Sequence, residues 1–305
     1  MQPFDYYKPK NFDEAFKLLT LPDKLMYPLA GATDLIPHTR DGAWKPDGVV
    51  DIKGLPGLRD LTVEGLEPCC GCAPGECLYV GAAVRMNEIA GSPLVRSHWD
   101  VLAQAAAAMG NEQVRNRATI GGNLGTASPA ADSAPALFVL DASLLIKGPT
   151  GDRSLPVERF FIGPKRNALK KGEIIVGILI PKPPAGAIGV YEKLSRRKAG
   201  DLSIVSVAVM AQPHNGGYRW HMALGAVAPT PIHAPQAEAI LNESHDDAHI
   251  DEAAAAAYGC CCPIDDVRAS AEYRQMMVVN ITRRAIRRVL TLQRSNVETL
   301  ERSHI

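Results

Sequence analysis

The sequence predicts an α+β protein built from three consecutive parts. Strand-like and helix-like segments alternate up to Pro181-Lys182-Pro183-Pro184, three strand-like runs follow this proline stretch, and the chain closes on helices. A stiff proline stretch is typical of a boundary between structural parts. We therefore expect an N-terminal part at 1–55, a middle part at 56–180 and a C-terminal part at 181–305.

Capping and propensity predict the helices of the first two parts. A helix is expected at 12–19, because Asn11 precedes it and Glu14 follows three positions later, which is a capping pattern. The alanine-rich stretch 100–109 should be helical, since alanine has the highest helix propensity. Apolar runs between turn residues predict strands at 25–30, 48–52, 58–63, 78–83, 142–146 and 173–180.

The C-terminal part reads as strands followed by helices. Strands are expected at 187–195, 203–212 and 218–228, and Asn215-Gly216-Gly217 supplies a hairpin turn between the last two. Helices are expected at 233–241, 250–258 and 267–293. Residues 294–305 are polar, and we expect them to fray.

The composition excludes several classes of protein. Of 305 residues 46% are hydrophobic and 22% charged, and 33 Lys and Arg balance 33 Asp and Glu. Nucleic-acid binding is not expected, because it needs a basic surplus or stripe. No apolar run approaches the roughly 18 residues of a membrane span, and the N-terminus lacks the pattern of a secretory signal. We expect a cytoplasmic location.

One glycine-rich stretch has the pattern of a clamp for a phosphorylated ligand. Residues 114–125 read Val-Arg-Asn-Arg-Ala-Thr-Ile-Gly-Gly-Asn-Leu-Gly. Gly121 and Gly122 lack Cβ atoms, so positive φ and close approach of backbone N–H groups to an anion are open to them. Residues 128–132 then lead into an apolar run at 134–140, which predicts a loop before a helix. A hairpin without ligand is the alternative.

A second turn of small residues strengthens this interpretation. A strand-like run ends at Ala30 and is followed by Gly31-Ala32-Thr33-Asp34, whose amides could form an anion-binding concavity. Neither segment is a Walker A loop or a dinucleotide fingerprint. A different way of holding a nucleotide is therefore expected.

These segments together resemble the FAD-binding medium subunit of the molybdenum hydroxylases, the family of xanthine dehydrogenase and carbon monoxide dehydrogenase. The resemblance extends over nearly the whole chain. It is carried by the segments 4–9, 119–124 with 129–132, 172–181, 193–208 and 265–274. It implies a two-part FAD-binding domain of the p-cresol methylhydroxylase/vanillyl-alcohol-oxidase type, with a βαβ-type first part and a mixed sheet in the second. A C-terminal antiparallel sheet with helices would follow.

The same resemblance implies which residues bind non-covalent FAD. They are Leu29, Ala30, Gly31, Ala32, Thr33, Asp34, Leu35, Thr119, Ile120, Gly121, Gly122, Asn123, Ser128, Ala131, Asp132, Lys193, Arg197, Asp201 and Leu202. The last four would lie near the flavin ring. Where this chain has Ala32 the family usually has glycine. Because alanine is strained at positive φ, we expect Ala32 at negative φ or a shifted turn.

The resemblance also implies a function in electron transfer. A large subunit would oxidise substrate at a molybdenum cofactor, and a small subunit would pass electrons through [2Fe–2S] clusters to the FAD of this chain. NAD or a quinone would accept them. No catalytic residue is expected in this chain, whose His38, His221 and His233 are isolated. The alternatives are a free-standing FAD oxidoreductase of the same fold and an Fe–S scaffold without flavin.

Seven cysteines gather in two patches. They are Cys69, Cys70, Cys72 and Cys77, followed far along the chain by Cys260, Cys261 and Cys262. Clustered thiols in an intracellular protein indicate metal binding rather than disulfides. Thiolates from both patches would hold a [4Fe–4S] cluster or zinc if the two loops meet. Cysteines that bind no metal are the third alternative, and the resemblance supplies no ligand set.

Overall fold

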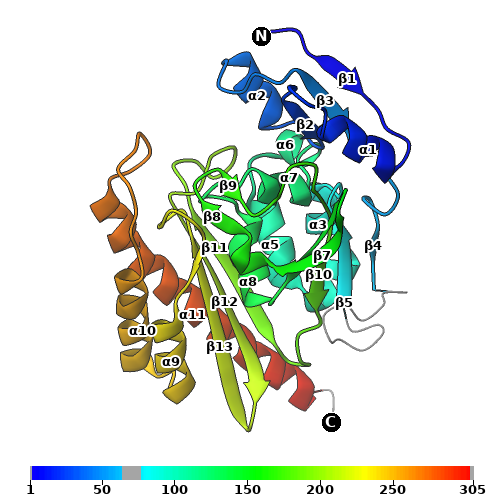
Figure 1. Ribbon diagram of the computed structural model, residues 1–305. Helices are drawn as coiled ribbons and strands as arrows, with labels where there is room; N and C mark the ends of the chain where they lie inside the picture. Colours follow the sequence, from blue (N-terminus) through cyan, green and yellow to red (C-terminus); the bar gives the residue numbers. More distant parts are fainter. Residues whose placement is uncertain (1, 64–76, 303–305) are drawn as a thin grey trace. The chain divides into compact units, whose positions relative to one another are not determined.

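The computed structural model describes residues 2–63 and 77–302 and divides the chain into two compact units (Figure 1). Unit 1 consists of Met1–Ile89, Asn111–Ser128 and Asp141–Lys182, and unit 2 of Ala90–Gly110, Pro129–Leu140 and Pro183–Ile305. Helices and strands occur in both units, so the predicted α+β class is confirmed.

The first sheet of unit 1 is parallel and contains a β–α–β crossover. Its elements in chain order are β1 (Asp5–Tyr7), α1 (Phe12–Leu19), β2 (Met26–Leu29), α2 (Leu35–Arg40) and β3 (Gly48–Asp51). β3 lies between β1 and β2 and pairs in parallel with both. α1 begins where expected, because the Asn11 side chain accepts a hydrogen bond from the Glu14 N–H at 2.9 Å.

The second sheet of unit 1 is antiparallel throughout its described pairs, so the expected mixed sheet is wrong. Its spatial order is β4 (Leu61–Thr62), β5 (Cys77–Gly81), β10 (Ile174–Pro181), β6 (Ser143–Gly148) and β7 (Gly151–Pro156). Unit 1 also contains α6 (Glu112–Arg115), α7 (Ile120–Gly125), η1 (Val157–Arg159) and the hairpin of β8 (Phe161–Gly163) and β9 (Arg166–Asn167), and α3 (Met86–Gly91) begins in it. Its core joins α1 to both sheets, through Ala15, Val50 and Val176.

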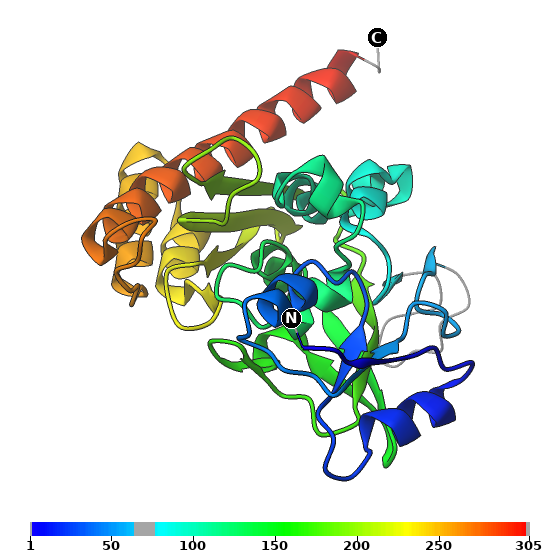
Figure 2. The ribbon, with the colours of Figure 1, turned by 90° about the horizontal axis from the view of Figure 1, so that it is seen from above.

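Unit 2 is an antiparallel sheet with helices on both faces (Figures 1 and 2). The sheet consists of β11 (Ile188–Leu194), β12 (Val205–His214), β13 (Gly217–Gly225) and β14 (Ile232–His233). One face is covered by α9 (Pro235–Glu243), α10 (Asp247–Gly259) and α11 (Ala271–Arg302). α5 (Asp100–Ala108) and α8 (Ser133–Val139) contact the strands as well, and α4 (Pro93–His98) precedes α5.

The alternation of side chains along β12 explains why both faces are covered. Val205, Val207 and Val209 belong to the core that includes the C-terminal helices. Ser206 and Ala208, which point the other way in a strand of period two, are buried too. No helix in residues 2–63 or 77–302 combines the length and apolar character that a membrane crossing requires.

Candidate functional site

The turn between β2 and α2 combines close packing with a strained residue. A Cβ atom on Gly31 would lie 2.3 Å from the backbone oxygen of Arg117, so only glycine fits there. Ala32 adopts a φ of +64°. Our expectation that Ala32 adopts a negative φ is therefore wrong, and the alternative of a shifted turn stays a prediction. A left-handed alanine costs about 1–2 kcal/mol, and such strain is typically stored at functional sites.

The same turn contains consecutive backbone N–H groups without a protein acceptor among the described residues. Within the part of the chain that the structure describes, the amides of residues 31–34 donate to no protein acceptor. Successive amides around a left-handed residue form a concavity that binds anions. The predicted anion-binding chemistry of this turn therefore has the backbone it needs.

The Gly-Gly-Asn segment is folded differently from our expectation. Gly121 and Gly122 lie in the first turn of α7 and have no positive φ. Their amides are engaged: Gly121 N–H donates to the Ala82 oxygen at 2.9 Å, and Gly122 N–H to the Thr119 hydroxyl at 3.2 Å. Capping and tertiary contacts therefore use both amides, and FAD binding at Gly121 and Gly122 stays a prediction.

The two glycines nevertheless have different surroundings. A Cβ on Gly121 would lie 2.6 Å from the Ala82 Cβ, so this glycine is needed for packing inside unit 1. A Cβ on Gly122 would meet only the Thr119 hydroxyl oxygen, at 3.1 Å. The space over Gly122 is therefore open to a ligand.

Direct contacts bring the two turns together inside unit 1. The Thr126 hydroxyl, just after α7, donates to the Asp34 carboxylate at 2.8 Å. Gly31 packs against the backbone of Arg117 and Ala118, immediately before Thr119. Two segments that lie far apart in the sequence thus form one surface, as a shared ligand site requires.

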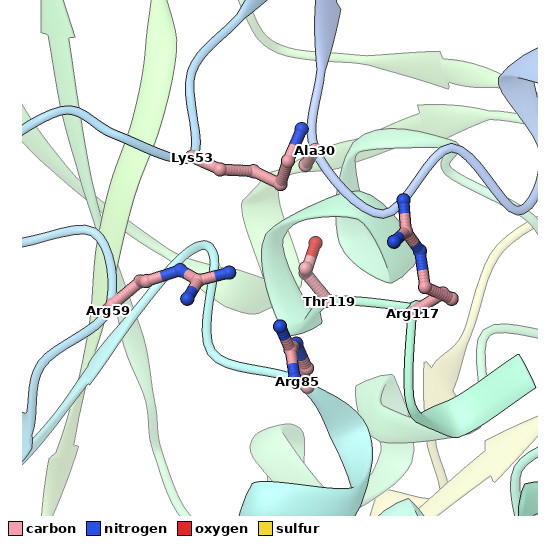
Figure 3. Close-up of a pocket in the computed structure, with 6 residues that line it drawn as sticks. All are labelled: Ala30, Lys53, Arg59, Arg85, Arg117 and Thr119. Atoms are coloured by element: carbon pink, nitrogen blue, oxygen red, sulfur yellow. The ribbon is translucent and has the colours of Figure 1, made fainter. Parts of the chain in front are cut away.

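A cationic pocket adjoins this surface (Figure 3). It is lined by Ala30, Lys53, Arg59, Arg85, Arg117 and Thr119, all of unit 1. Arg59 and Arg85 point toward Thr119, and Lys53 extends toward Ala30. We call these six residues the cationic pocket.

An acidic side chain fixes one of the four cations. The Lys53 ammonium contacts the Asp51 carboxylate at 2.6 Å, and the Tyr6 hydroxyl donates to the same carboxylate at 2.6 Å. Burial disfavours the charged form of Asp51, but the hydrogen bonds from Lys53 and Tyr6 outweigh burial and lower its pKa. Asp51 therefore stays ionised and holds Lys53 at the rim of the pocket.

In unit 2, two of the predicted FAD-binding side chains belong to a buried polar network. The Asp132 carboxylate accepts hydrogen bonds from the Tyr191 hydroxyl at 2.9 Å and the Ser203 hydroxyl at 2.7 Å, and it pairs with the Lys193 ammonium at 3.0 Å. Lys193 also donates to the Ala108 oxygen. Burial, followed by the charge of Asp132, raises the pKa of Tyr191 well above its usual value. Asp132 and Lys193 thus connect β11 to α5 and to the segment before α8.

The other predicted residues of unit 2 differ in exposure. Ala131 is buried, whereas Leu202 is 54% exposed and Arg197 is exposed. The Asp201 carboxylate accepts the Leu202 N–H at 3.0 Å. The segment between β11 and β12 contains Arg197, Asp201 and Leu202.

The cysteine prediction stays a prediction. Cys69, Cys70 and Cys72 lie outside the described residues, and Cys77 is buried in β5. Thiols at the end of α10 donate to helix carbonyls, as Cys261 does to Ala257 at 3.2 Å. Burial raises the pKa of Cys261 to about 12. Among the described residues, no group of three or more His, Cys, Asp and Glu side chains is arranged to hold a metal ion.

Sequence reasoning missed three of the four cations of the cationic pocket. Lys53 and Arg85 each follow shortly after a strand, and Arg59 lies in the next loop, but no motif connects them. Of the four cations, Arg117 alone lies in a segment identified from the sequence, as do the pocket residues Ala30 and Thr119. The useful signal would have been cations placed shortly after strand ends, here after β3 of the first sheet and β5 of the second.

Two family models cover most of the chain. The FAD binding domain in molybdopterin dehydrogenase matches residues 2–183, and the CO dehydrogenase flavoprotein C-terminal domain matches residues 190–289. The chain belongs to the family of FAD-binding medium subunits of molybdenum hydroxylases. It is an oxidoreductase flavoprotein subunit by this membership.

Individual members of the family resemble the chain over most of its length. The carbon monoxide dehydrogenase medium chain of Hydrogenophaga pseudoflava is 31% identical over 93% of this chain and 96% of its own. The nicotinate dehydrogenase FAD-subunit of Eubacterium barkeri is 34% identical over 79% of this chain and 80% of its own. A solved carbon monoxide dehydrogenase from Hydrogenophaga pseudoflava matches with a TM-score of 0.88 and 32% identity, over 95% of this chain and 99% of that one.

Proposed function

We propose that this chain is the electron-transfer flavoprotein of a multi-subunit molybdenum-dependent dehydrogenase or hydroxylase. The observation that carries the proposal is the pair of turns joined in unit 1, beside the cationic pocket and inside the segment that matches the FAD-binding model. When bound, FAD would supply the redox chemistry, taking electrons from [2Fe–2S] clusters of a small subunit and giving them to an acceptor such as NAD or a quinone. Substrate oxidation belongs to a large molybdenum subunit.

The residues of unit 1 fit the anionic part of FAD. The amides of residues 31–34 donate to no acceptor among the described residues, so they are free to donate to phosphate oxygens. Gly122 leaves room for the cofactor against α7. These groups bind and orient the cofactor. Because the site is already formed, little conformational entropy of the protein is lost when the cofactor binds.

The residues proposed for the flavin ring act in two ways. Arg197, Asp201 and Leu202 belong to an accessible segment that is open to contact with the ring. Lys193 is held by Asp132, which balances its charge, and by the Ala108 oxygen, so we propose that it positions β11. The cytoplasmic location expected from the sequence stays a prediction.

Substitution of Gly122 tests the placement of FAD. Gly122→Val places a branched side chain in the open space over α7, so the variant should purify folded but with most of its flavin lost. Flavin content is measured by absorbance near 450 nm after denaturation, and folding by urea unfolding. Gly122→Ala is the milder variant, for the case in which valine disturbs the Thr119 cap.

Gly125→Val is the matched control on the same helix. A Cβ on Gly125 meets nothing within 4 Å, so this variant places the same side chain on α7 at a position that is not among the proposed FAD-binding residues. It should keep its flavin. Full flavin content in both Gly122 variants would show that FAD does not lie against α7.

A further inference from the structure

The free edge of the sheet in unit 2 places a histidine beside a carboxylate. β14 lies at this edge and pairs with β13 only at Ala223 and Leu224. The Glu238 side chain, in the first turn of α9, occupies the next position along the edge, because its Oε1 accepts the Met222 N–H at 2.7 Å. The same oxygen lies 3.7 Å from Nδ1 of His233, an ion-pair distance rather than a hydrogen bond. One carboxylate thus joins β13, β14 and α9.

His233 also reaches a helix on the opposite face of the sheet. It pairs with Ala223, which alternates along β13 with Met222 and Leu224 of the core under the C-terminal helices. The His233 ring therefore lies on the other face, where it stacks on the Phe138 ring of α8 with the centroids 5.2 Å apart. From the edge between them, His233 contacts one helix on each face of the sheet (Figure 1).

The charges around His233 favour its protonated form. Burial raises the pKa of Glu238, but the adjacent His233, the Met222 N–H and the charge of His221 outweigh burial and lower it. The N-terminus of α9 favours the ionised carboxylate as well. A carboxylate that stays ionised stabilises an imidazolium beside it.

The other titratable groups around Glu238 leave this pairing intact. His221 lies on the same face of β13 as Ala223, and its charge acts on Glu238 in the same sense as that of His233. Cys260 follows α10. Burial, and then the charge of Glu238, raise the pKa of the Cys260 thiol, so it stays neutral near pH 7. α8 contributes no titratable side chain.

We propose that His233 and Glu238 form a pH-sensitive clasp, which closes the free edge of the sheet and holds α8 and α9 against it when His233 is protonated. Histidine changes its charge between about pH 5 and 8. The stabilisation should be complete well below the ordinary histidine pKa of about 6.5 and should fade as His233 loses its proton at higher pH. An uncovered edge strand can pair with other chains, so the closed clasp also protects β13. The clasp does not rest on the proposed function, because none of its residues is among those proposed for FAD.

Amide hydrogen exchange of the full chain, followed by NMR from acidic to alkaline pH, tests the clasp. The Met222 amide reports on it directly, because its acceptor is Glu238. After correction for the intrinsic exchange rate, the protection of this amide should fall about twofold to fivefold as the pH rises, the usual contribution of a partly exposed ion pair. The ring protons of His233 titrate in the same samples. Glu238→Gln should shift their midpoint to lower pH, since glutamine keeps an acceptor for the Met222 N–H but not the charge.

Two substitutions of His233 separate charge from packing. His233→Phe keeps an aromatic ring against Phe138 but cannot be protonated, so the protection of the Met222 amide should be low at every pH. His233→Arg carries a fixed positive charge, so this protection should stay high at every pH. A pH dependence that survives in both His233→Phe and Glu238→Gln would overturn the clasp, as would a parent chain whose Met222 protection does not change with pH.

Two other histidines of unit 2 provide the controls. His249 pairs with Asp246 at the start of α10, at 2.8 Å, so His249→Gln should leave the pH dependence of Met222 protection unchanged. His221→Gln should reduce this dependence less than His233→Phe does, because the effect of His221 on Glu238 is the smaller one. Equal losses in His249→Gln and His233→Phe would overturn the clasp. A dependence that His221→Gln abolishes and His233→Phe leaves intact would overturn it too.

Discussion

Ala32 adopts a strained left-handed backbone conformation in the turn between β2 and α2. A substitution that relieves this strain should change the stability of the protein. Its φ of +64° costs about 1–2 kcal/mol relative to glycine, whereas glycine loses about 0.5–1 kcal/mol more through chain entropy. Ala32→Gly should therefore raise the free energy of unfolding by about 0.5 kcal/mol, measured by urea denaturation, and flavin should be retained.

A nearby alanine without positive φ provides the comparison. Ala43 is exposed in the loop after α2, so Ala43→Gly changes the entropy of the unfolded chain without relieving strain. It should lower the free energy of unfolding slightly. If Ala32→Gly destabilises the protein as much as Ala43→Gly does, the left-handed conformation carries no strain.

At the scale of elements, a buried ion pair fixes the start of α11. The Arg274 guanidinium is 2% exposed on its side chain, donates to the Ile204 and Ala226 oxygens, and pairs with Asp266 at 2.8 Å. Asp266 also binds Arg268. Hydrogen bonds from Arg268 lower the pKa of Asp266 well below its usual range, against the opposing effect of burial.

Removal of the Asp266 charge should destabilise unit 2 in a pH-dependent way. Asp266→Asn leaves Arg274 buried without its counter-charge, and such changes cost about 3 kcal/mol of unfolding free energy. Because the folded pKa is depressed, the stabilisation is complete above the unfolded pKa of about 4 and is lost as the pH falls further. Urea unfolding of the parent and of Asp266→Asn should be measured at several pH values. The difference between their free energies of unfolding should shrink as the pH falls below about 4.

An exposed ion pair in the same unit is the control for this effect. Asp251 pairs with Arg283, and its side chain is 54% exposed. Asp251→Asn should change the free energy of unfolding by less than about 1 kcal/mol at any pH. A difference between parent and Asp266→Asn that stays constant with pH would contradict the role of the ionised carboxylate.

Local patterns predicted some elements well and others not at all. α1 and its Asn11 cap follow from neighbouring residues, and so does the hairpin turn at Asn215-Gly216, where both residues have positive φ. α7 could not be predicted, because three of its six residues are glycine and only the Thr119 cap and contacts with distant strands make it helical. α11 continues to Arg302, beyond the expected end at 293.

At the scale of the whole molecule, chain order and compact units do not coincide. Residues 90–110 and 129–140 belong to unit 2, because α5 and α8 pack on its sheet, although both lie between segments of unit 1. The cationic pocket likewise draws on separate loops of unit 1. Long-range assembly of this kind leaves no periodic trace in the sequence. Local patterns therefore indicated the two glycine-bearing segments, but neither the helical form of α7 nor the cations Lys53, Arg59 and Arg85.

The proposed place of this chain in a larger complex predicts what it cannot do alone. Relatives named as medium chains or FAD subunits span nearly the same length, and the buried titratable groups of unit 2 are engaged in structural networks. An affinity-tagged chain should therefore co-purify from its host with a molybdenum-containing subunit and a [2Fe–2S] subunit, detected by mass spectrometry and metal analysis. The isolated chain should carry flavin and show no substrate oxidation.

Robust turnover by the isolated chain would favour a free-standing oxidoreductase. Iron and acid-labile sulfide in that chain, after anaerobic preparation, would instead indicate a cluster at its cysteines. Because these readouts are independent, one purification distinguishes the three functions.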